Sequence, residues 1–277
     1  MSATVLTEFE SIVIATDGGS AGRAALRWVL VHAGDRPVCI ELVSAMADED
    51  AETRAEQERL LRAAQQVLQV ILPLAEVTLT FVSGDPIEAL ERASGLCDLM
   101  VIGSHHASLG HPRRRGIPQR LAELARCPVV VVPGDWLGGR GPVVIGVTAD
   151  SIPPAVLAFG GREAADMGAT LRLAHVWNMP GVGAEDPSQD PGIESIPERQ
   201  RRALARLDAV ATLAEPGIRV DSELRQGAVV ASLLEMAADA SLLVIGRAQR
   251  SIRLRTLFGS VSREVLATPP CPVAVIP

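Results

Sequence analysis

The amino-acid sequence of 277 residues predicts an α/β fold, in two tandem copies of a doubly wound domain with a five-stranded parallel sheet. The first observation is a repeat: Gly103 and Gly116 recur 143 residues later as Gly246 and Gly259, and Cys-Pro-Val opens a final apolar run in both halves. The second is an alternation of strand-length apolar runs with amphipathic helical segments, which is typical of βαβ units. The third is that these runs are continuously apolar, as in strands covered on both faces.

In the first copy, residues 12–16 form the first expected strand, and the turn Asp17-Gly18-Gly19-Ser20 follows with residues that favour a helix start. The next helix is predicted by apolar positions at helical spacing, namely Ala25, Trp28, Val29 and His32. Because Trp28 lies on this apolar face, core packing explains it better than stacking on a ligand. Further strands are expected at residues 38–45, 77–82, 99–102 and 129–132, and further helices at residues 60–71, at 86–94 and after Gly116.

The second copy repeats this order, with its first two strands expected at residues 143–147 and 171–176. Its long helix keeps the apolar positions of the first copy, shifted by 143, and an extra Pro/Gly/acid-rich stretch before it predicts a surface loop at 178–197. A glycine-rich linker separates the copies and places the domains at residues 1–137 and 138–277. We expect the last strands of the two copies to pair about a pseudo-twofold axis, because each ends an open sheet.

Charge and composition exclude several classes of protein. The formal net charge is −7 and the sequence pI is about 5.3, which argues against binding nucleic acid or an anionic membrane. No apolar run reaches the roughly 20 residues that span a bilayer, and the first residues lack the basic and apolar segments of a secretory signal. We therefore expect a cytoplasmic protein.

Two further absences in the sequence restrict the chemistry. The chain contains no lysine, so a P-loop lysine, a Schiff-base lysine and a lysine general base are all excluded. Its four cysteines, Cys39, Cys97, Cys127 and Cys271, show no close pairing, which predicts neither a zinc site nor a disulfide framework. A reducing compartment suits them, and each thiol is expected to be a small apolar core residue.

Two glycine-rich segments follow the first and fourth strands of the first copy, and both leave the carboxyl ends of those strands. Ligands of doubly wound sheets bind at that edge, where the strand order reverses. Glycine permits close approach of a backbone to phosphate, and the next helix offers free N–H groups. Without lysine, phosphate charge has to meet backbone amides, arginines or a metal.

On these residues the chain resembles a tandem universal stress protein over essentially its whole length. The family pattern is Gly-x2-Gly-x9-Gly-Ser/Thr after the fourth strand, with an aspartate ending the first strand. In ATP-binding members, the aspartate contacts the adenine end, and the glycine loop holds ribose and phosphates. The resemblance implies the adenine-nucleotide α-hydrolase-like fold, a homodimer of the whole chain and an adenine-nucleotide ligand.

Each copy departs from the binding pattern. In the first copy, His106 replaces the second glycine and Ile117 replaces the Ser/Thr; in the second, Gln249 and Thr148 replace the second glycine and the aspartate. A side chain at the second glycine obstructs close backbone approach. The candidate nucleotide contacts are Asp17, Gly103, His105 and Gly116 in the first copy, and Thr148, Val176, Gly246, Gln249, Gly259 and Ser260 in the second.

Several other residues have two interpretations. His105, His106 and His111 share one loop, but no carboxylate or cysteine joins them, so a polar loop is favoured over a metal site. His175 ends a strand beside the predicted site, and a hydrogen-bonded, partly buried histidine is favoured over a ligand contact. The arginines of the two equivalent loops have two interpretations: they bind phosphates or an acidic partner, or they form a solvated charged loop. They are Arg113, Arg114 and Arg115 in the first copy and Arg247, Arg250, Arg253 and Arg255 in the second.

The sequence therefore predicts a non-catalytic stress-response or regulatory protein that binds ATP weakly or in one copy only. Ser260, which keeps a hydroxyl for phosphate, favours the second copy. A slow ATPase is the enzymatic alternative, and it is disfavoured because only His105 and His106 lie near a glycine loop as candidate bases. A nucleotide-free interaction scaffold is the third interpretation.

Overall fold

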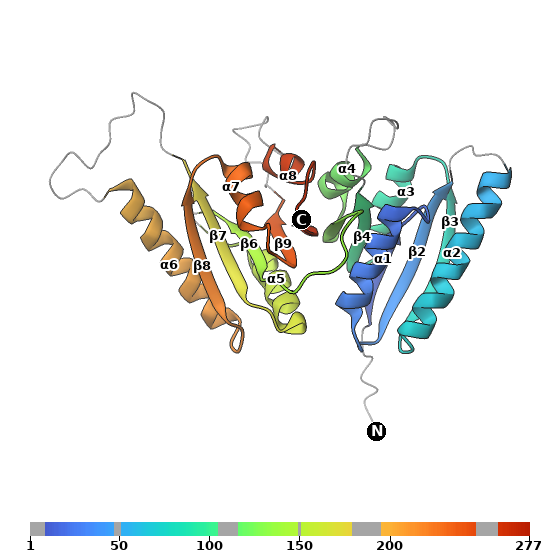
Figure 1. Ribbon diagram of the computed structural model, residues 1–277, viewed down its shortest axis with the longest axis horizontal. Helices are drawn as coiled ribbons and strands as arrows, with labels where there is room; N and C mark the ends of the chain where they lie inside the picture. The colour runs from blue at the N-terminus through green and yellow to red at the C-terminus, as the bar shows by residue number, and fades with distance from the viewer. Residues whose placement is uncertain (1–8, 47–50, 105–115, 149–150, 179–194, 248–259) are drawn as a thin grey trace, which may run out of the picture. The chain divides into compact units, whose positions relative to one another are not determined.

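A computed structural model describes residues 9–46, 51–104, 116–148, 151–178, 195–247 and 260–277 of the chain. The chain divides into two compact units, Met1–Leu137 and Gly138–Ile276 (Figure 1). Each unit is a parallel sheet with helices on both faces.

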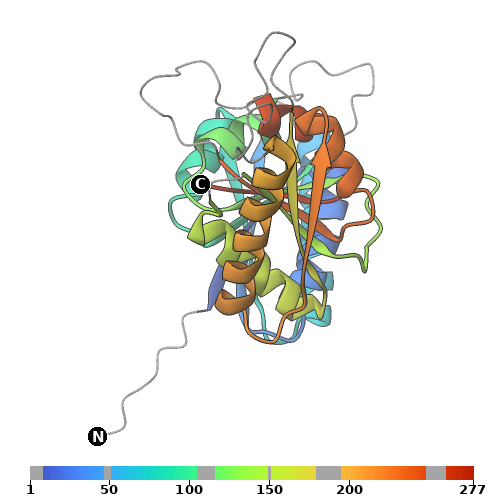
Figure 2. The same ribbon diagram turned by 90° about the vertical axis from the view of Figure 1, so that its left-hand side faces the viewer.

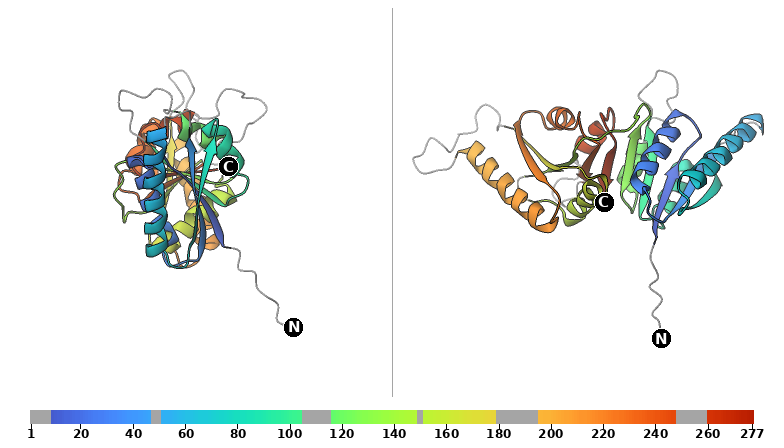
Figure 3. Two further views of the ribbon diagram at one scale, coloured as in Figure 1. Left: turned by 90° about the vertical axis from the view of Figure 1, so that its right-hand side faces the viewer. Right: turned by 60° about the horizontal axis from the view of Figure 1, so that its bottom comes forward.

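The first unit contains five strands in the order β3-β2-β1-β4-β5, all of them parallel. The chain leaves β1 toward β2 on one side and returns to β4 on the other, so the order reverses between β1 and β4. Figure 3 shows α2 lying along the face of the sheet near β2 and β3. The elements are β1 (Glu10–Ala15), α1 (Ser20–Ala33), β2 (Val38–Met46), α2 (Ala51–Ile71), β3 (Glu76–Ser83), α3 (Pro86–Ala93), β4 (Leu99–Ser104), α4 (Ile117–Leu124) and β5 (Val129–Pro133).

The second unit repeats this topology, with parallel strands in the order β8-β7-β6-β9-β10. Figure 2 shows α6 in front of its sheet, beside β8. The elements are β6 (Val143–Val147), α5 (Pro154–Met167), β7 (Leu171–Trp177), α6 (Ile196–Ala214), β8 (Val220–Gln226), α7 (Val229–Met236), β9 (Leu242–Gly246), α8 (Ser260–Val265) and β10 (Val273–Ile276). The predicted fold class is confirmed in both copies, whereas pairing of the copies through β5 and β10 stays a prediction.

The central strands form the core of each unit. Every residue of β5 is buried, and Trp28 of α1 is only 1% exposed, so its predicted core role is confirmed. The edge strands β3 and β8 are largely half-buried or exposed, and for them the expectation of burial on both faces was wrong. An edge strand has a neighbouring strand on one side only, so it tolerates polar residues.

Helix starts in both units follow local capping chemistry. The Oδ1 atom of Asp85 accepts hydrogen bonds from the backbone N–H of Ile87 (2.7 Å) and Glu88 (3.3 Å) and so caps α3. At the start of α6, Ser195 and Glu198 form a reciprocal capping box, and the hydrogen bonds from Ser195 lower the pKa of Glu198. Across the described ranges, no helix is both long and apolar enough to cross a membrane.

Candidate functional site

The turn from β1 into α1 holds the first predicted contact, Asp17. Its Oδ1 atom accepts a hydrogen bond of 2.9 Å from the N–H of Gly19, and the N–H of Gly18 donates to the hydroxyl of Thr16. Gly18 has a φ of 78°, the left-handed region that glycine adopts without strain. The carboxylate of Asp17 is half-buried and is already engaged in its own turn.

Gly103 lies near the carboxyl end of β4, directly against the first turn of α1. A Cβ atom at this position would lie 2.0 Å from the carbonyl oxygen of Ala21, a distance that no real contact shows. The absence of a side chain at Gly103 is therefore explained by helix packing alone. Ala15 and Ile102 are paired in register, so Asp17 and Gly103 lie beyond neighbouring positions of adjacent strands, as the sequence predicted.

Gly116 is the N-cap residue of α4 and differs from Gly103 in its surroundings. Among the described residues, a Cβ atom added there would meet nothing within 4 Å, and its φ of −123° is open to any residue. Neither packing against the described residues nor backbone conformation therefore requires glycine. Because Gly116 has no side chain, it provides no cap for the first N–H groups of α4, those of Ile117 and Gln119 since Pro118 has none, and such groups suit an anion.

The corresponding turn in the second unit has different chemistry. The Oγ1 atom of Thr148 donates a 3.4 Å hydrogen bond to the carbonyl oxygen of Ser151, and the side chain is exposed. A Cβ atom added at Gly246 would lie 3.3 Å from the Cγ2 atom of Val156, a tight contact but not an overlap. Val176 is half-buried near the carboxyl end of β7.

Part of each predicted site lies outside the described residues: His105, His106 and the loop arginines Arg113 to Arg115 in the first copy, and Gln249, Gly259 and most of the loop arginines in the second. Ser260 is described only as the first residue of α8. The structure thus brings Asp17 and Gly103 together at the carboxyl ends of β1 and β4. Thr148 and Gly246 lie at the carboxyl ends of β6 and β9 in the second unit.

His175 has hydrogen-bond partners on both ring nitrogens. Its Nδ1 atom lies 3.0 Å from the carbonyl oxygen of Val147, and its Nε2 atom lies 2.8 Å from the Oε1 atom of Gln200 on α6. The residue is only 5% exposed. These contacts support the structural interpretation of His175 over a ligand contact.

Sequence reasoning missed two glutamines that occupy the same place in the two copies. On α2, Gln57 donates from Nε2 to the Oγ atom of Ser44 at 2.9 Å, just as Gln200 contacts His175. Strand register makes Ser44 and His175 equivalent, and Gln57 and Gln200 are 143 residues apart. The repeat offset of 143 residues, applied to all positions of α2 and α6, would have identified this pair.

The cysteines are not uniformly core residues. Cys127 and Cys271 are buried as expected, but Cys39 and Cys97 are partly exposed, so the expectation was wrong for those two. All four are free thiols. Among the described residues, no three side chains of the metal-ligating types gather, while His105, His106 and His111 lie outside that part of the chain.

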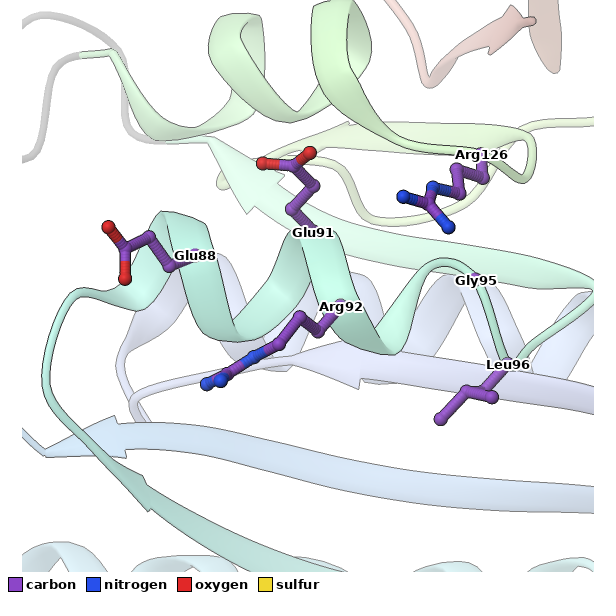
Figure 4. Close-up of a pocket in the computed structure, with 6 residues that line it drawn as sticks. All are labelled: Glu88, Glu91, Arg92, Gly95, Leu96 and Arg126. Atoms are coloured by element: carbon purple, nitrogen blue, oxygen red, sulfur yellow. The ribbon is translucent and has the colours of Figure 1, made fainter.

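A surface hollow of about 410 Å³ runs along α3. Figure 4 shows its six lining residues: Glu88, Glu91, Arg92, Gly95, Leu96 and Arg126. None is a predicted nucleotide contact, and its two carboxylates balance its two guanidinium groups. It therefore carries no net charge that would select an ionic ligand.

The fold and the two strand-end sites define a tandem doubly wound α/β protein with one candidate ligand site in each copy. The model of the Universal stress protein family matches residues 8–133 and again residues 139–277. The chain belongs to the universal stress protein family, which confirms the resemblance seen in the sequence.

Known universal stress proteins are similar to this chain over most or nearly all of its length. A universal stress protein of Mycolicibacterium smegmatis is 27% identical over 290 residues, which cover 98% of this chain and 97% of the relative. One from Mycobacterium tuberculosis is 25% identical, over 69% of this chain and 65% of the relative. The crystal structure of a universal stress protein from Archaeoglobus fulgidus has a TM-score of 0.70 at 17% identity, covering 97% of this chain and 98% of that one, which supports the fold.

Two solved universal stress proteins contain adenine nucleotides, one cAMP and the other dAMP. They cover 46% and 50% of this chain, with TM-scores of 0.37 and 0.35. These likenesses are too weak to indicate what this chain binds.

Proposed function

We propose that the protein is a non-catalytic regulatory protein of the stress response that binds an adenine nucleotide, ATP, weakly or in one copy only. The observation that carries the proposal is the geometry at Gly116. There a helix begins at a glycine that neither φ nor packing against the described residues requires, at the carboxyl ends of the strands, where doubly wound sheets bind ligands. Backbone N–H groups at such a helix start suit phosphate.

Three features favour weak binding. Asp17 already accepts a hydrogen bond from Gly19, so it must share or exchange that bond to contact a ligand. Thr148 stands at the aspartate position of the second copy and donates to Ser151. His106 and Gln249 place side chains where the family pattern has a glycine that approaches the ligand.

The hydrogen bonds of Asp17 and Thr148 also favour the alternative of a nucleotide-free interaction scaffold. They give both side chains a partner within their own turns, without a ligand. A slow ATPase has less support. The chain has no lysine, and the described histidines His32 and His175 are both buried against partners within the fold. Neither is positioned as a general base beside a glycine loop.

The experiment has two stages. First, protein purified from cells is denatured and any released nucleotide is identified. Second, titration calorimetry with ATP compares the parent with Gln249→Gly, Ser260→Ala and Gly116→Ala. We expect Gln249→Gly to raise affinity, and Ser260→Ala to lower it about tenfold, the effect of losing one hydrogen bond to a charged group.

Gly116→Ala separates the two copies, because the added methyl group meets no neighbour among the described residues. A loss of affinity in this variant places ATP in the first copy, whereas a loss in Ser260→Ala alone places it in the second. Tight ATP binding at both sites of the parent would contradict the proposal. An absence of binding even in Gln249→Gly would favour the scaffold.

The homodimer implied by the family resemblance and the cytoplasmic location expected from the sequence stay predictions. Sedimentation equilibrium of the full chain tests the first, and fractionation of the source cells tests the second.

A further inference from the structure

Two free cysteines of the first unit lie with their sulfur atoms in contact. Cys97 is in the turn between α3 and β4, and Cys127 is in the turn between α4 and β5. Their Sγ atoms are 3.5 Å apart, within hydrogen-bond distance for two thiols. The strands that follow these turns are neighbours, and Met100 is paired with Val129, so the sheet itself holds the two turns together.

The two thiols differ in exposure and acidity. Cys97 is partly exposed, whereas Cys127 is only 5% exposed. The hydrogen bond from Cys127 lowers the pKa of the Cys97 thiol, outweighing burial and the Asp98 carboxylate, which raise it. The same hydrogen bond and burial raise the pKa of Cys127. A partly exposed thiol of lowered pKa beside a buried thiol is the arrangement of a reactive cysteine with a resolving partner.

The hollow along α3 reaches the residues next to the pair. Leu96 and Arg126, the residues immediately before the two cysteines, both line it, and Leu96 is 87% exposed (Figure 4). Small water-soluble molecules therefore reach the chain next to Cys97.

We propose that Cys97 and Cys127 form a redox modification site that a peroxide converts into an intramolecular disulfide. The Cys97 thiolate attacks one peroxide oxygen, the O–O bond breaks, and Cys97 becomes a sulfenic acid; with hydrogen peroxide the leaving hydroxide takes up a proton and forms water. The Cys127 sulfur then attacks the Cys97 sulfur. The S–S bond forms, and the sulfenic oxygen leaves as a second water molecule with the thiol proton. Overall, two thiols are oxidised and one peroxide is reduced to two water molecules.

The second unit contains half of this pair and serves as an internal control. Cys271 occupies the place of Cys127 in its Cys-Pro-Val segment, but Ala240 stands where Cys97 would be. Cys271 is 2% exposed, and burial raises its pKa to about 12. It has neither a neighbouring thiol at that position nor the acidity of a peroxide-reactive cysteine.

The disulfide would join the two ends of a segment that carries a candidate ligand loop. Residues 97–127 include β4, the stretch from Gly103 to Gly116, and α4. The bond lies at the amino ends of β4 and β5, at the opposite end of the strands from that stretch.

The test uses the reduced full-length chain and hydrogen peroxide, with remaining thiols alkylated under denaturing conditions. Trypsin cleaves after arginine, so the disulfide should appear as the peptide of residues 93–113 linked to that of residues 127–140. The intact mass should fall by two hydrogens, and dithiothreitol should restore it. Cys271 should react at least about tenfold more slowly than Cys97.

Two serine variants test the order of the steps. In Cys127→Ser, Cys97 should accumulate sulfenic acid that dimedone traps and then advance to sulfinic acid. In Cys97→Ser, Cys127 should remain a thiol. A parent chain that oxidises Cys97 to sulfinic acid without a link to Cys127, or that oxidises Cys271 as fast, would overturn the proposal. The measurement on the parent decides the matter even if a variant fails to fold.

Discussion

The first helix begins at different places in the two copies. α1 starts at Ser20, and the equivalent residue of the second copy is Ser151, but α5 starts three residues later, at Pro154. The cause is the Pro153-Pro154 pair, because a residue that precedes proline is disfavoured in the helical region. The second copy therefore lacks the first turn of this helix.

This difference changes what the glycine of each fourth strand does. In the first copy, the extra helical turn brings the carbonyl group of Ala21 against Gly103. In the second, the described residues that Gly246 faces are Val156, through its side chain, and, farther away, the ring of Pro153. Glycines at one position of one motif thus have different structural roles, and a glycine pattern alone is weak evidence for a bound phosphate.

This difference should have its largest effect on stability when each of these two glycines is replaced by alanine. Gly103→Ala should destabilise the first unit by about 3 kcal/mol or more, because a backbone carbonyl cannot move aside as a side chain can. Gly246→Ala should cost about 1 kcal/mol, since Val156 at 3.3 Å has to give way by only a few tenths of an ångström. Urea unfolding distinguishes the units in backgrounds that keep one tryptophan, Trp28 for the first unit or Trp177 for the second, with Trp136 replaced by phenylalanine in both.

Gly116→Ala is the matched control, and its unfolding should resemble that of the parent because the added methyl group meets none of the described residues. Equal losses of stability in Gly103→Ala and Gly246→Ala would show that the missing helical turn has no energetic consequence.

A second difference lies at the carboxyl ends of β2 and β7, where glutamines at equivalent positions contact a serine in one copy and a histidine in the other. His175→Ala should cost roughly 2–4 kcal/mol, because it leaves a cavity and removes partners from Val147 and Gln200. Ser44→Ala should cost about 1 kcal/mol, since it removes one hydrogen bond and little volume. Chemical denaturation of both variants measures the contrast.

The control for this pair is the double variant Ser44→Ala with Gln57→Leu, which removes both polar partners. The Oε1 atom of Gln57 is buried without a hydrogen bond, so replacing the amide should recover much of the loss. A double variant clearly less stable than Ser44→Ala would mean that Gln57 contributes more than this hydrogen bond.

The third difference, between the cysteines, predicts a change of stability with alkaline pH. The pKa of Cys271 rises from its ordinary 9.0 to about 12 in the folded chain. Between those values the unfolded chain has released this proton and the folded chain retains it, so stability should fall as pH rises, by at most about 1.4 kcal/mol per pH unit. The chain has no lysine or tyrosine, so only cysteine side chains have ordinary pKa values in this window.

Thermal unfolding of the second unit between pH 9 and 12, followed in the background that keeps Trp177 alone, checks this slope. Cys271→Ala should flatten it. In the first unit, the raised pKa of Cys127 should give a similar fall in stability above pH 9, because Cys97, whose pKa is lowered, is deprotonated in both the folded and the unfolded chain there. Just below pH 9, the lowered pKa of Cys97 should instead make the stability of the first unit rise with pH, and a fall there would contradict its direction.

Local sequence determined most of the architecture. Strand-length apolar runs, the helical spacing around Trp28 and the 143-residue repeat predicted the order of strands and helices in both copies. They do so because burial of an apolar face requires a fixed period along the chain. The same patterns placed Asp17, Gly103, Thr148 and Gly246 at the carboxyl ends of their strands.

Tertiary structure decided which distant atoms meet. The contact between Cys97 and Cys127, the hydrogen bond between His175 and Gln200 and the crowding of Gly103 by Ala21 each join separate elements of the fold. No periodicity encodes such contacts, because they depend on strand register and on where each helix begins. The sequence therefore determined which residues line each strand end, and the folded packing determined what each of them touches.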